Sequence, residues 1–372
     1  MAYVHVLLWL FLMLIVKISA KVPAIIVFGD SSVDAGNNNY IPTIARSNFE
    51  PYGRDFNGGK PTGRFSNGRV PTDFISEELG LRPFVPAYLD PTYKISDFAV
   101  GVTFASAATG YDNATSDVLV SFEILFTVLY MKHTRMILTR TNYLQGVIPF
   151  WKELEYYKDY QKKLKAYLGE QKASETIADA LYLISIGTND FLENYYTLPK
   201  RQMQYTVDEY QDFLIGIARN FIVNLHGLGA RKISLGGLPP MGCMPLERAE
   251  NIQSGSACVE SYNVVALNFN NKLSNLVMTL NKELPGIQLV FSNPYNKLLQ
   301  IIKKPSLYGF DVSEVACCAT GMFEMGYACD RYNPLTCTDA NKYVFWDAFH
   351  PSERTNAILS YHMVKTVLHQ FH

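Results

Sequence analysis

The chain has 372 residues, of which 48% are hydrophobic and 18% charged, so it can bury a sizeable core and is not a disordered segment. Its formal net charge is −1, from 33 basic and 34 acidic residues, which removes the electrostatic basis for binding nucleic acid. The 24 Gly and 18 Pro are ordinary numbers that exclude collagen-like and low-complexity chains.

The N-terminal segment, residues 1–20, is predicted to be a secretory signal peptide. Residues 6–16 form an unbroken apolar run, VLLWLFLMLIV, and the small residue Ala20 follows shortly after it. Such a run suits the core of a signal peptide and is short for a membrane span, which needs about 20 apolar residues. We therefore expect a secreted chain without a stable membrane span, whose residues 21–372 form a single domain. An uncleaved anchor is the alternative, since only the α-amino group and His5 supply positive charge before the run.

Strand and helix patterns alternate along the rest of the chain. Short apolar runs rich in β-branched residues predict buried strands at 24–28, 181–186, 232–235 and 287–291. Helical periodicity predicts long helices at 207–228, 262–284 and 351–367, the last with Pro351 at an early position. This alternation indicates an α/β fold of three layers, α/β/α, around a central, mostly parallel sheet. Ligands of such sheets bind beyond the carboxyl ends of the strands, so reactive groups are expected directly after the predicted strands.

Two further features fit an extracellular protein. The six cysteines form an even number, which in an oxidising compartment suggests up to three disulfides: Cys243, Cys258, Cys317, Cys318, Cys329 and Cys337. We expect the adjacent pair at 317 and 318 to bond to different partners. A zinc site is the rival interpretation, but the chain has no C-x-x-C pair and no His at finger spacing, so no metal is expected. The sequon Asn113-Ala114-Thr115 predicts glycosylation at Asn113.

The first predicted strand is followed by a Ser in a polar, Gly-containing turn, FGDSSVDAGNNN at 28–39. A Ser between a strand and a helix exposes its hydroxyl, and amides at the start of the next helix can stabilise an anion. Ser31 is therefore a candidate nucleophile. The segment is not a G-x-S-x-G elbow, because Val33 fills the second Gly position, and a helix-capping Ser would explain it equally well by itself.

Two later segments carry groups that a Ser nucleophile requires. Asn189, in GTND at 187–190, offers a side-chain amide able to hold a developing oxyanion, although it would also serve as a helix cap. Near the C-terminus, Asp347 and His350 combine a base of near-neutral pKa with a carboxylate that can orient it. The D-x-x-H spacing also suits a metal pair, but no further ligand at the right spacing supports that interpretation.

The order and wording of these segments resemble the plant branch of the GDSL esterase/lipase family, within the SGNH-hydrolase superfamily. The resemblance extends over nearly all of the mature chain. It is carried by FGDSSVDAGNNN (28–39), YGRDFNGGKPTGRFSNGR (52–69), GVTFASAATGYDN (101–113), GTND (187–190), CCATGMFEMGYAC (317–329) and YVFWDAFHPSE (343–353).

The resemblance implies a secreted serine hydrolase that cleaves carboxylic esters through an acyl-serine, with no metal and no organic cofactor. Ser31 would be the nucleophile, His350 the general base, and Asp347 the residue that orients His350. The oxyanion hole would combine the Ser31 N–H, the Asn189 side chain and one backbone N–H from residues 101–113. Family members commonly have Gly where this chain has Ala108, and a donor survives that change only if the local φ is negative. We therefore expect Gly110 to supply the third donor.

The resemblance leaves the substrate open. A small-molecule or lipid ester is expected, but neither the acyl length nor the oligomeric state follows from the sequence. Phe191, Tyr195 and Tyr196 either line the substrate cleft or are packing residues. A catalytically idle extracellular binding protein, or an acyltransferase, on the same fold is the alternative to a hydrolase.

Residues 120–146 depart from the pattern. This stretch, VSFEILFTVLYMKHTRMILTRTNYLQG, is apolar, holds one acidic residue and shows no sustained helical or strand period. A lid over an acyl-binding cleft and an ordinary surface excursion are two interpretations, although exposure of so apolar a segment is costly. We favour a third, that it is a retained intron translated as protein.

Overall fold

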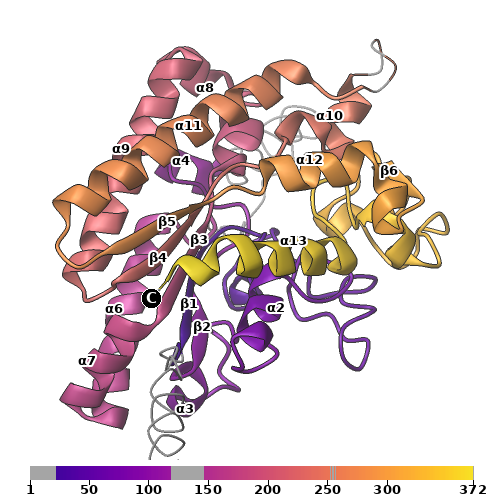
Figure 1. The fold of residues 1–372 in the computed structure, drawn as a ribbon. Helices are drawn as coiled ribbons and strands as arrows, with labels where there is room; N and C mark the ends of the chain where they lie inside the picture. Colours follow the sequence, from indigo (N-terminus) through magenta and orange to yellow (C-terminus); the bar gives the residue numbers. More distant parts are fainter. Residues whose placement is uncertain (1–21, 119–145, 252, 254, 256, 372) are drawn as a thin grey trace, which may run out of the picture.

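The computed structural model describes residues 22–118, 146–251, 253, 255 and 257–371 (Figure 1). The predicted signal peptide lies outside these residues, as does the atypical insert apart from Gly146.

A parallel sheet forms the centre of the fold, with the strand order β2-β1-β3-β4-β5. Its strands are β1 (Ile25–Gly29), β2 (Gly101–Thr103), β3 (Leu181–Ser185), β4 (Lys232–Gly236) and β5 (Gln288–Ser292). The four predicted strands are confirmed to within about a residue, whereas the three residues of β2 are too short a run to predict. The order reverses between β1 and β3, and ligands of doubly wound sheets bind in the crevice at such a switch point.

Helices cover both faces of the sheet, which confirms the three-layer prediction (Figure 1). One face packs against α6 (Phe150–Leu168), α7 (Glu170–Asp179), α9 (Val207–Gly227) and α11 (Glu260–Glu283). The other packs against α2 (Pro71–Glu78) and α13 (Glu353–Thr366). Shorter helices complete the chain: α3 (Ile95–Phe98), α4 (Asn113–Ser116), α8 (Pro199–Gln202), α10 (Pro245–Glu250) and α12 (Tyr295–Lys303). Among the described residues, none of the helices has the length and apolar character needed to span a membrane.

The start of α13 differs from the prediction. The helix begins at Glu353, after the N-cap Ser352, whose hydroxyl accepts the N–H of Thr355 at 3.3 Å. Pro351 therefore lies outside the helix, where it forms an isolated bridge with Phe345. The predicted helix is present but begins two residues later than expected, because Ser352 is a better N-cap than the residue before Pro351.

A second, two-stranded sheet and two disulfides adjoin the C-terminal motif. In it, β6 (Val312–Ala316) pairs with β7 (Tyr343–Phe345). The described disulfides join Cys243 to Cys258, Cys317 to Cys337 and Cys318 to Cys329. The adjacent cysteines have different partners, as predicted. Their backbone N–H groups donate to the carbonyls of Phe345 and Trp346, which directly precede Asp347.

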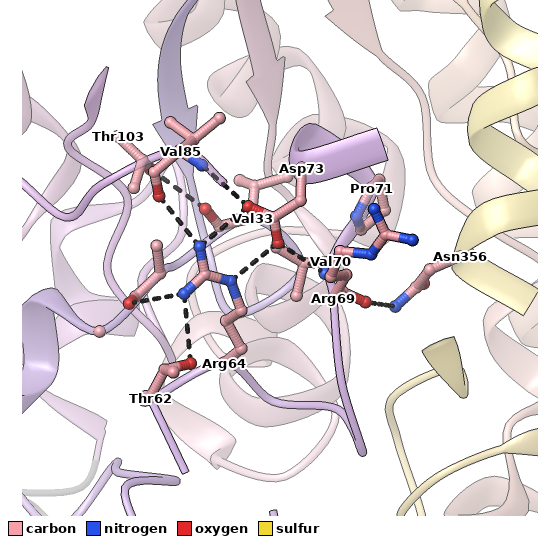
Figure 2. A network of polar contacts seen from close by, with 12 residues as sticks. Val33, Thr62, Arg64, Arg69, Val70, Pro71, Asp73, Val85, Thr103 and Asn356 are labelled. Atoms are coloured by element: carbon pink, nitrogen blue, oxygen red, sulfur yellow. Dashed lines mark hydrogen bonds and ion pairs between the residues drawn. The ribbon is translucent and has the colours of Figure 1, made fainter. Parts of the chain in front are cut away.

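A buried ion pair fixes the loop that leads into α2 (Figure 2). Arg64 donates through Nε and Nη2 to the two oxygens of Asp73 at 2.8 and 2.9 Å, and the side chains are 6% and 0% exposed. Other Arg64 N–H groups reach the Val85 carbonyl and the Thr62 hydroxyl. Asp73 also accepts the N–H groups of Val70 and Val85. Two-point pairing with every remaining group hydrogen-bonded is the geometry that best offsets the loss of hydration.

Candidate active site

Ser31 lies in a tight turn at the carboxyl end of β1. Gly29 has φ 144°, and a Cβ there would overlap the carbonyl oxygen of Ser185, so only Gly allows β1 to lie this close to β3. The N–H groups of Val33 and Asp34 donate to the Asp30 carbonyl at 3.1 and 3.0 Å, which closes the turn. The helix expected directly after Ser31 is replaced by this turn, and the next helical element is a 3₁₀ turn at Asn37–Tyr40.

The structure brings Ser31, His350 and Asp347 together in one chain of hydrogen bonds. His350 Nε2 is 2.8 Å from Ser31 Oγ, and His350 Nδ1 is 2.8 and 2.9 Å from the two oxygens of Asp347. Asp347 Oδ1 also accepts the N–H groups of Phe349 and His350 at 2.9 and 2.7 Å. The carboxylate therefore closes the short turn that carries the imidazole, and it fixes the ring in position.

Tyr52 holds the far side of the Asp347 carboxylate, a contact that sequence reasoning missed. Its hydroxyl donates to Asp347 Oδ2 at 2.6 Å and accepts the N–H of Gly326 at 2.8 Å. Burial, followed by the charge of Asp347, raises the pKa of Tyr52 well above its usual value, so the phenol keeps its proton. Tyr52 belongs to the YGRDF motif, but nothing in that pattern distinguishes it from the many other Tyr of the chain.

Asn189 lies at the start of a π-helical segment, Asp190–Tyr195, yet its side chain makes no capping bond there. Its Nδ2 instead donates to the Thr109 carbonyl at 2.8 Å, against the backbone of the 108–110 turn. The Asn189 amide therefore lies against the backbone of the residue that precedes Gly110, and its role in an oxyanion hole stays a prediction. Asn189 is 2% exposed.

The 108–110 turn is held by the neighbouring Asp190. This carboxylate accepts the N–H groups of Tyr111 and Asp112 at 2.8 and 2.9 Å, and burial raises its pKa to about 7. A Cβ on Gly110 would collide with it, so Gly110 is Gly for reasons of space. Ala108 adopts φ 65°, in the left-handed region that normally favours Gly.

A further buried carboxyl, also missed from the sequence, lies beneath the nucleophile turn. Glu153 of α6 accepts the Gly29 N–H through Oε2 at 2.9 Å and is 0% exposed. Burial raises its pKa well above the usual value for Glu, which favours the protonated form. Its position suggests that it supports the end of β1.

A cavity of about 140 Å³ opens beside Ser31 and His350. Its walls are mostly apolar and include Ile186, Met244, Leu298 and Phe349. Such walls suit an uncharged acyl group better than a charged one. Of the three aromatic residues after Asn189, Phe191 and Tyr195 are packing residues, whereas Tyr196 lines a separate cavity with Tyr262.

Two other sequence predictions can be placed. Asn113 is exposed at the start of α4, where its Oδ1 accepts the Trp151 indole N–H at 3.0 Å. Among the residues that the structure describes, no group of three or more His, Cys, Asp or Glu is arranged to hold a metal ion.

Comparison with known proteins gives one consistent result. The family described as GDSL-like Lipase/Acylhydrolase matches residues 25–363. The chain is 64% identical over 356 residues to GDSL esterase/lipase At2g04570 of Arabidopsis thaliana, covering 96% of this chain and 94% of the relative. It is 57% identical to GDSL esterase/lipases At2g42990 and At4g26790 of the same plant, with 95% and 96% of this chain and 93% and 95% of the relatives covered.

Proposed function

The chain belongs to the GDSL-like lipase/acylhydrolase family and is a carboxylic ester hydrolase of the SGNH type, and on this premise we propose that it acts through an acyl-serine intermediate on Ser31. The observation that carries the proposal is the continuous set of hydrogen bonds from Ser31 Oγ through His350 to Asp347. The position of Ser31 directly after β1, at the switch point where ligands of such sheets bind, supports the proposal.

In the first step, Ser31 Oγ attacks the ester carbonyl carbon while His350 Nε2 takes the hydroxyl proton. The bond to the leaving alcohol then breaks, and the His350 imidazolium returns the proton to the alcohol oxygen. In the second step, His350 Nε2 takes a proton from water, and the resulting hydroxide attacks the carbonyl carbon of the acyl-serine. The bond from that carbon to Ser31 Oγ then breaks, the His350 imidazolium returns the proton to Oγ, and the carboxylic acid is released. Asp347 stabilises the imidazolium in both steps.

We place the tetrahedral oxyanion against the Ser31 N–H, the Asn189 amide and a backbone N–H of the 108–110 turn. Gly110 is the predicted third donor, chosen on the expectation that a Cβ at 108 would exclude the positive φ of a Gly. Ala108 nevertheless adopts φ 65°, the conformation of a Gly at that position, so its N–H is a second candidate for the third donor. Removing one such donor typically costs about 10²–10³ in kcat. Asn189→Ala should therefore lower kcat by that factor with little change in KM.

We also propose that the protein is secreted as residues 21–372, a single domain, after cleavage of residues 1–20. The three disulfides of the described residues support an oxidising destination. On this route Asn113 would be glycosylated, which is consistent with its exposure. The expected substrates are small-molecule or lipid esters.

A fluorophosphonate probe tests the proposal, since it labels only an activated serine. We expect the secreted protein to be labelled and to hydrolyse short p-nitrophenyl esters, and Ser31→Ala to lose both properties while remaining folded. Ser76→Ala, which removes a buried hydroxyl of α2 that donates to the Arg82 carbonyl, is the matched control. A folded protein that neither labels nor hydrolyses would be an idle binding protein. Release of a new ester in preference to acid when glycerol is added would indicate an acyltransferase.

A further inference from the structure

Resting on the proposed function, we infer that the acyl chain of the ester extends from Ser31 under α13 into a second apolar cavity, so that the enzyme selects medium-length acyl chains. The second cavity also measures about 140 Å³. It lies between α13 and the carboxyl halves of β3, β4 and β5. Its walls include Ile75, Leu183, Leu359 and Met363.

The second cavity adjoins the one beside Ser31. The residues that line both are Pro71, Ser185, Gly237, Pro294 and Leu359. All five are partly exposed rather than buried. On our inference, these shared residues wall the passage by which an acyl group attached to Ser31 enters the second cavity.

The sequence explains why α13 leaves this space. Along the face that α13 covers, Leu181 and Leu183 of β3 are large, and Leu183 also lines the cavity. The register partner of Leu183 on β4, Ser234, is small, as are Ser185 and Gly236 nearer the carboxyl ends of the strands, and all three line the cavity. Protein interiors are normally filled to crystal-like density, so a row of small residues beneath a helix leaves room for a ligand.

The volumes set the expected chain length. A cavity of about 150 Å³ lined by apolar side chains accommodates benzene, so each of these cavities suits about six carbon atoms. Lys297 and the exposed His362 also line the second cavity. Acyl chains too long for the two cavities would reach solvent beside these polar groups and would bury no further apolar surface. The kcat/KM should therefore rise by up to about fourfold per methylene and level off near about twelve carbons.

Filling the second cavity tests the inference without touching the triad. Ser234 points into it from β4, and its hydroxyl has no hydrogen-bond partner among the described residues, so Ser234→Ala leaves the cavity open at no loss of a bond. Ser234→Leu fills it from the sheet. Met363→Trp fills it from the half-buried face of α13, with Met363→Leu as the matched control, in case the strand substitution prevents folding.

The measurement is kcat/KM for p-nitrophenyl esters with acyl chains of four and twelve carbons, below their critical micelle concentrations. We expect Ser234→Leu or Met363→Trp to lower the value for the long ester at least tenfold and to leave the short ester within about twofold, with both controls unchanged. Equal effects on both esters, or no effect in folded variants, would overturn the inference while leaving the esterase assignment intact. A wild-type protein that hydrolyses neither ester would contradict the proposed function itself.

Discussion

The hydroxyl of Tyr52 donates to Asp347 Oδ2 at 2.6 Å, and this bond joins the start of the chain to the triad near its end. Tyr52 in turn accepts the N–H of Gly326, which lies within the loop closed by the Cys318–Cys329 disulfide. The acid of the triad is therefore held by two structural units, the disulfide segment on one side and the His350 turn on the other.

We expect Tyr52→Phe to lower kcat/KM by about tenfold. The substitution keeps the buried ring but removes a neutral donor from Asp347, so the carboxylate loses one of the bonds that orient it and interacts more strongly with the His350 imidazolium. The apparent pKa of the acid limb of kcat/KM against pH should therefore move upward. A residue that only supports the fold would lower activity without moving this limb.

Tyr157→Phe is the matched control, because it removes another buried phenol, bonded to Tyr182, from the opposite face of the sheet. It should leave the pH profile in place. An unshifted acid limb in a folded Tyr52→Phe protein would show that Tyr52 does not tune the triad.

Because it buries several carboxyl groups, we expect this protein to be more stable in mild acid than at neutral or alkaline pH. Burial raises the pKa of Glu153 well above its ordinary value and that of Asp190 to about 7. Between about pH 4 and 7 the folded state therefore binds more protons than the unfolded state, so the free energy of unfolding falls as pH rises through this range. The Tm should be higher near pH 5 than near pH 8.

The substitution Glu153→Gln measures how much this one carboxyl group contributes to the pH dependence of stability. The amide oxygen can still accept the Gly29 N–H, but the side chain no longer releases a proton on unfolding. We expect the Tm to rise by a few degrees at pH 8 and to change little at pH 4. Glu155→Gln, on the exposed side of the same helix, should give no such gain. A Tm lowered equally at both pH values would mean that Glu153 is ionised in the folded state.

The roles of Glu153 and Tyr52 could not be predicted from the sequence. Strands such as 24–28 are predictable as continuous apolar runs, and Ser31 and Asn189 lie near each other because β1 and β3 end at one edge of the central sheet. His350 follows β7 of the second sheet, so its contact with Ser31 was predictable only from the family resemblance. Glu153 lies in the polar run KELEYYKDYQKK and resembles a solvated helix residue. Only the packing of α6 against the end of β1 buries it, and that long-range contact leaves no local signal.

Removing one partner of the buried pair of Arg64 and Asp73 should cost far more stability than removing one partner of an exposed pair. We expect Arg64→Met to lower the free energy of unfolding by about 3–5 kcal/mol, because it leaves the Asp73 carboxylate buried without its counter-ion. The loop carries Phe65, whose ring lies 5.0 Å from that of His350, so activity should fall as well.

The comparison is Arg82→Met, which breaks an Arg–carboxylate contact of 2.7 Å at the surface, to Asp97. Since solvent screens that pair, its loss should leave the midpoint of urea unfolding almost unchanged. Similar midpoints for the two variants would contradict the role assigned to Arg64.

The last prediction concerns residues 120–146, whose sequence does not resemble that of the family. The described residues on either side meet: the Val147 N–H donates to the Ser116 carbonyl at 3.0 Å. After deletion of 120–146, Ser116 and Val147 would be four residues apart, the separation of a single helical turn, so the same bond can close without strain. We expect the deletion variant to fold, to keep esterase activity and to be more soluble than the full chain. A variant with a Gly-Ser linker of equal length separates the effect of sequence from that of length. Loss of activity in the deletion variant alone, or cDNA that contains these codons, would contradict the retained-intron interpretation.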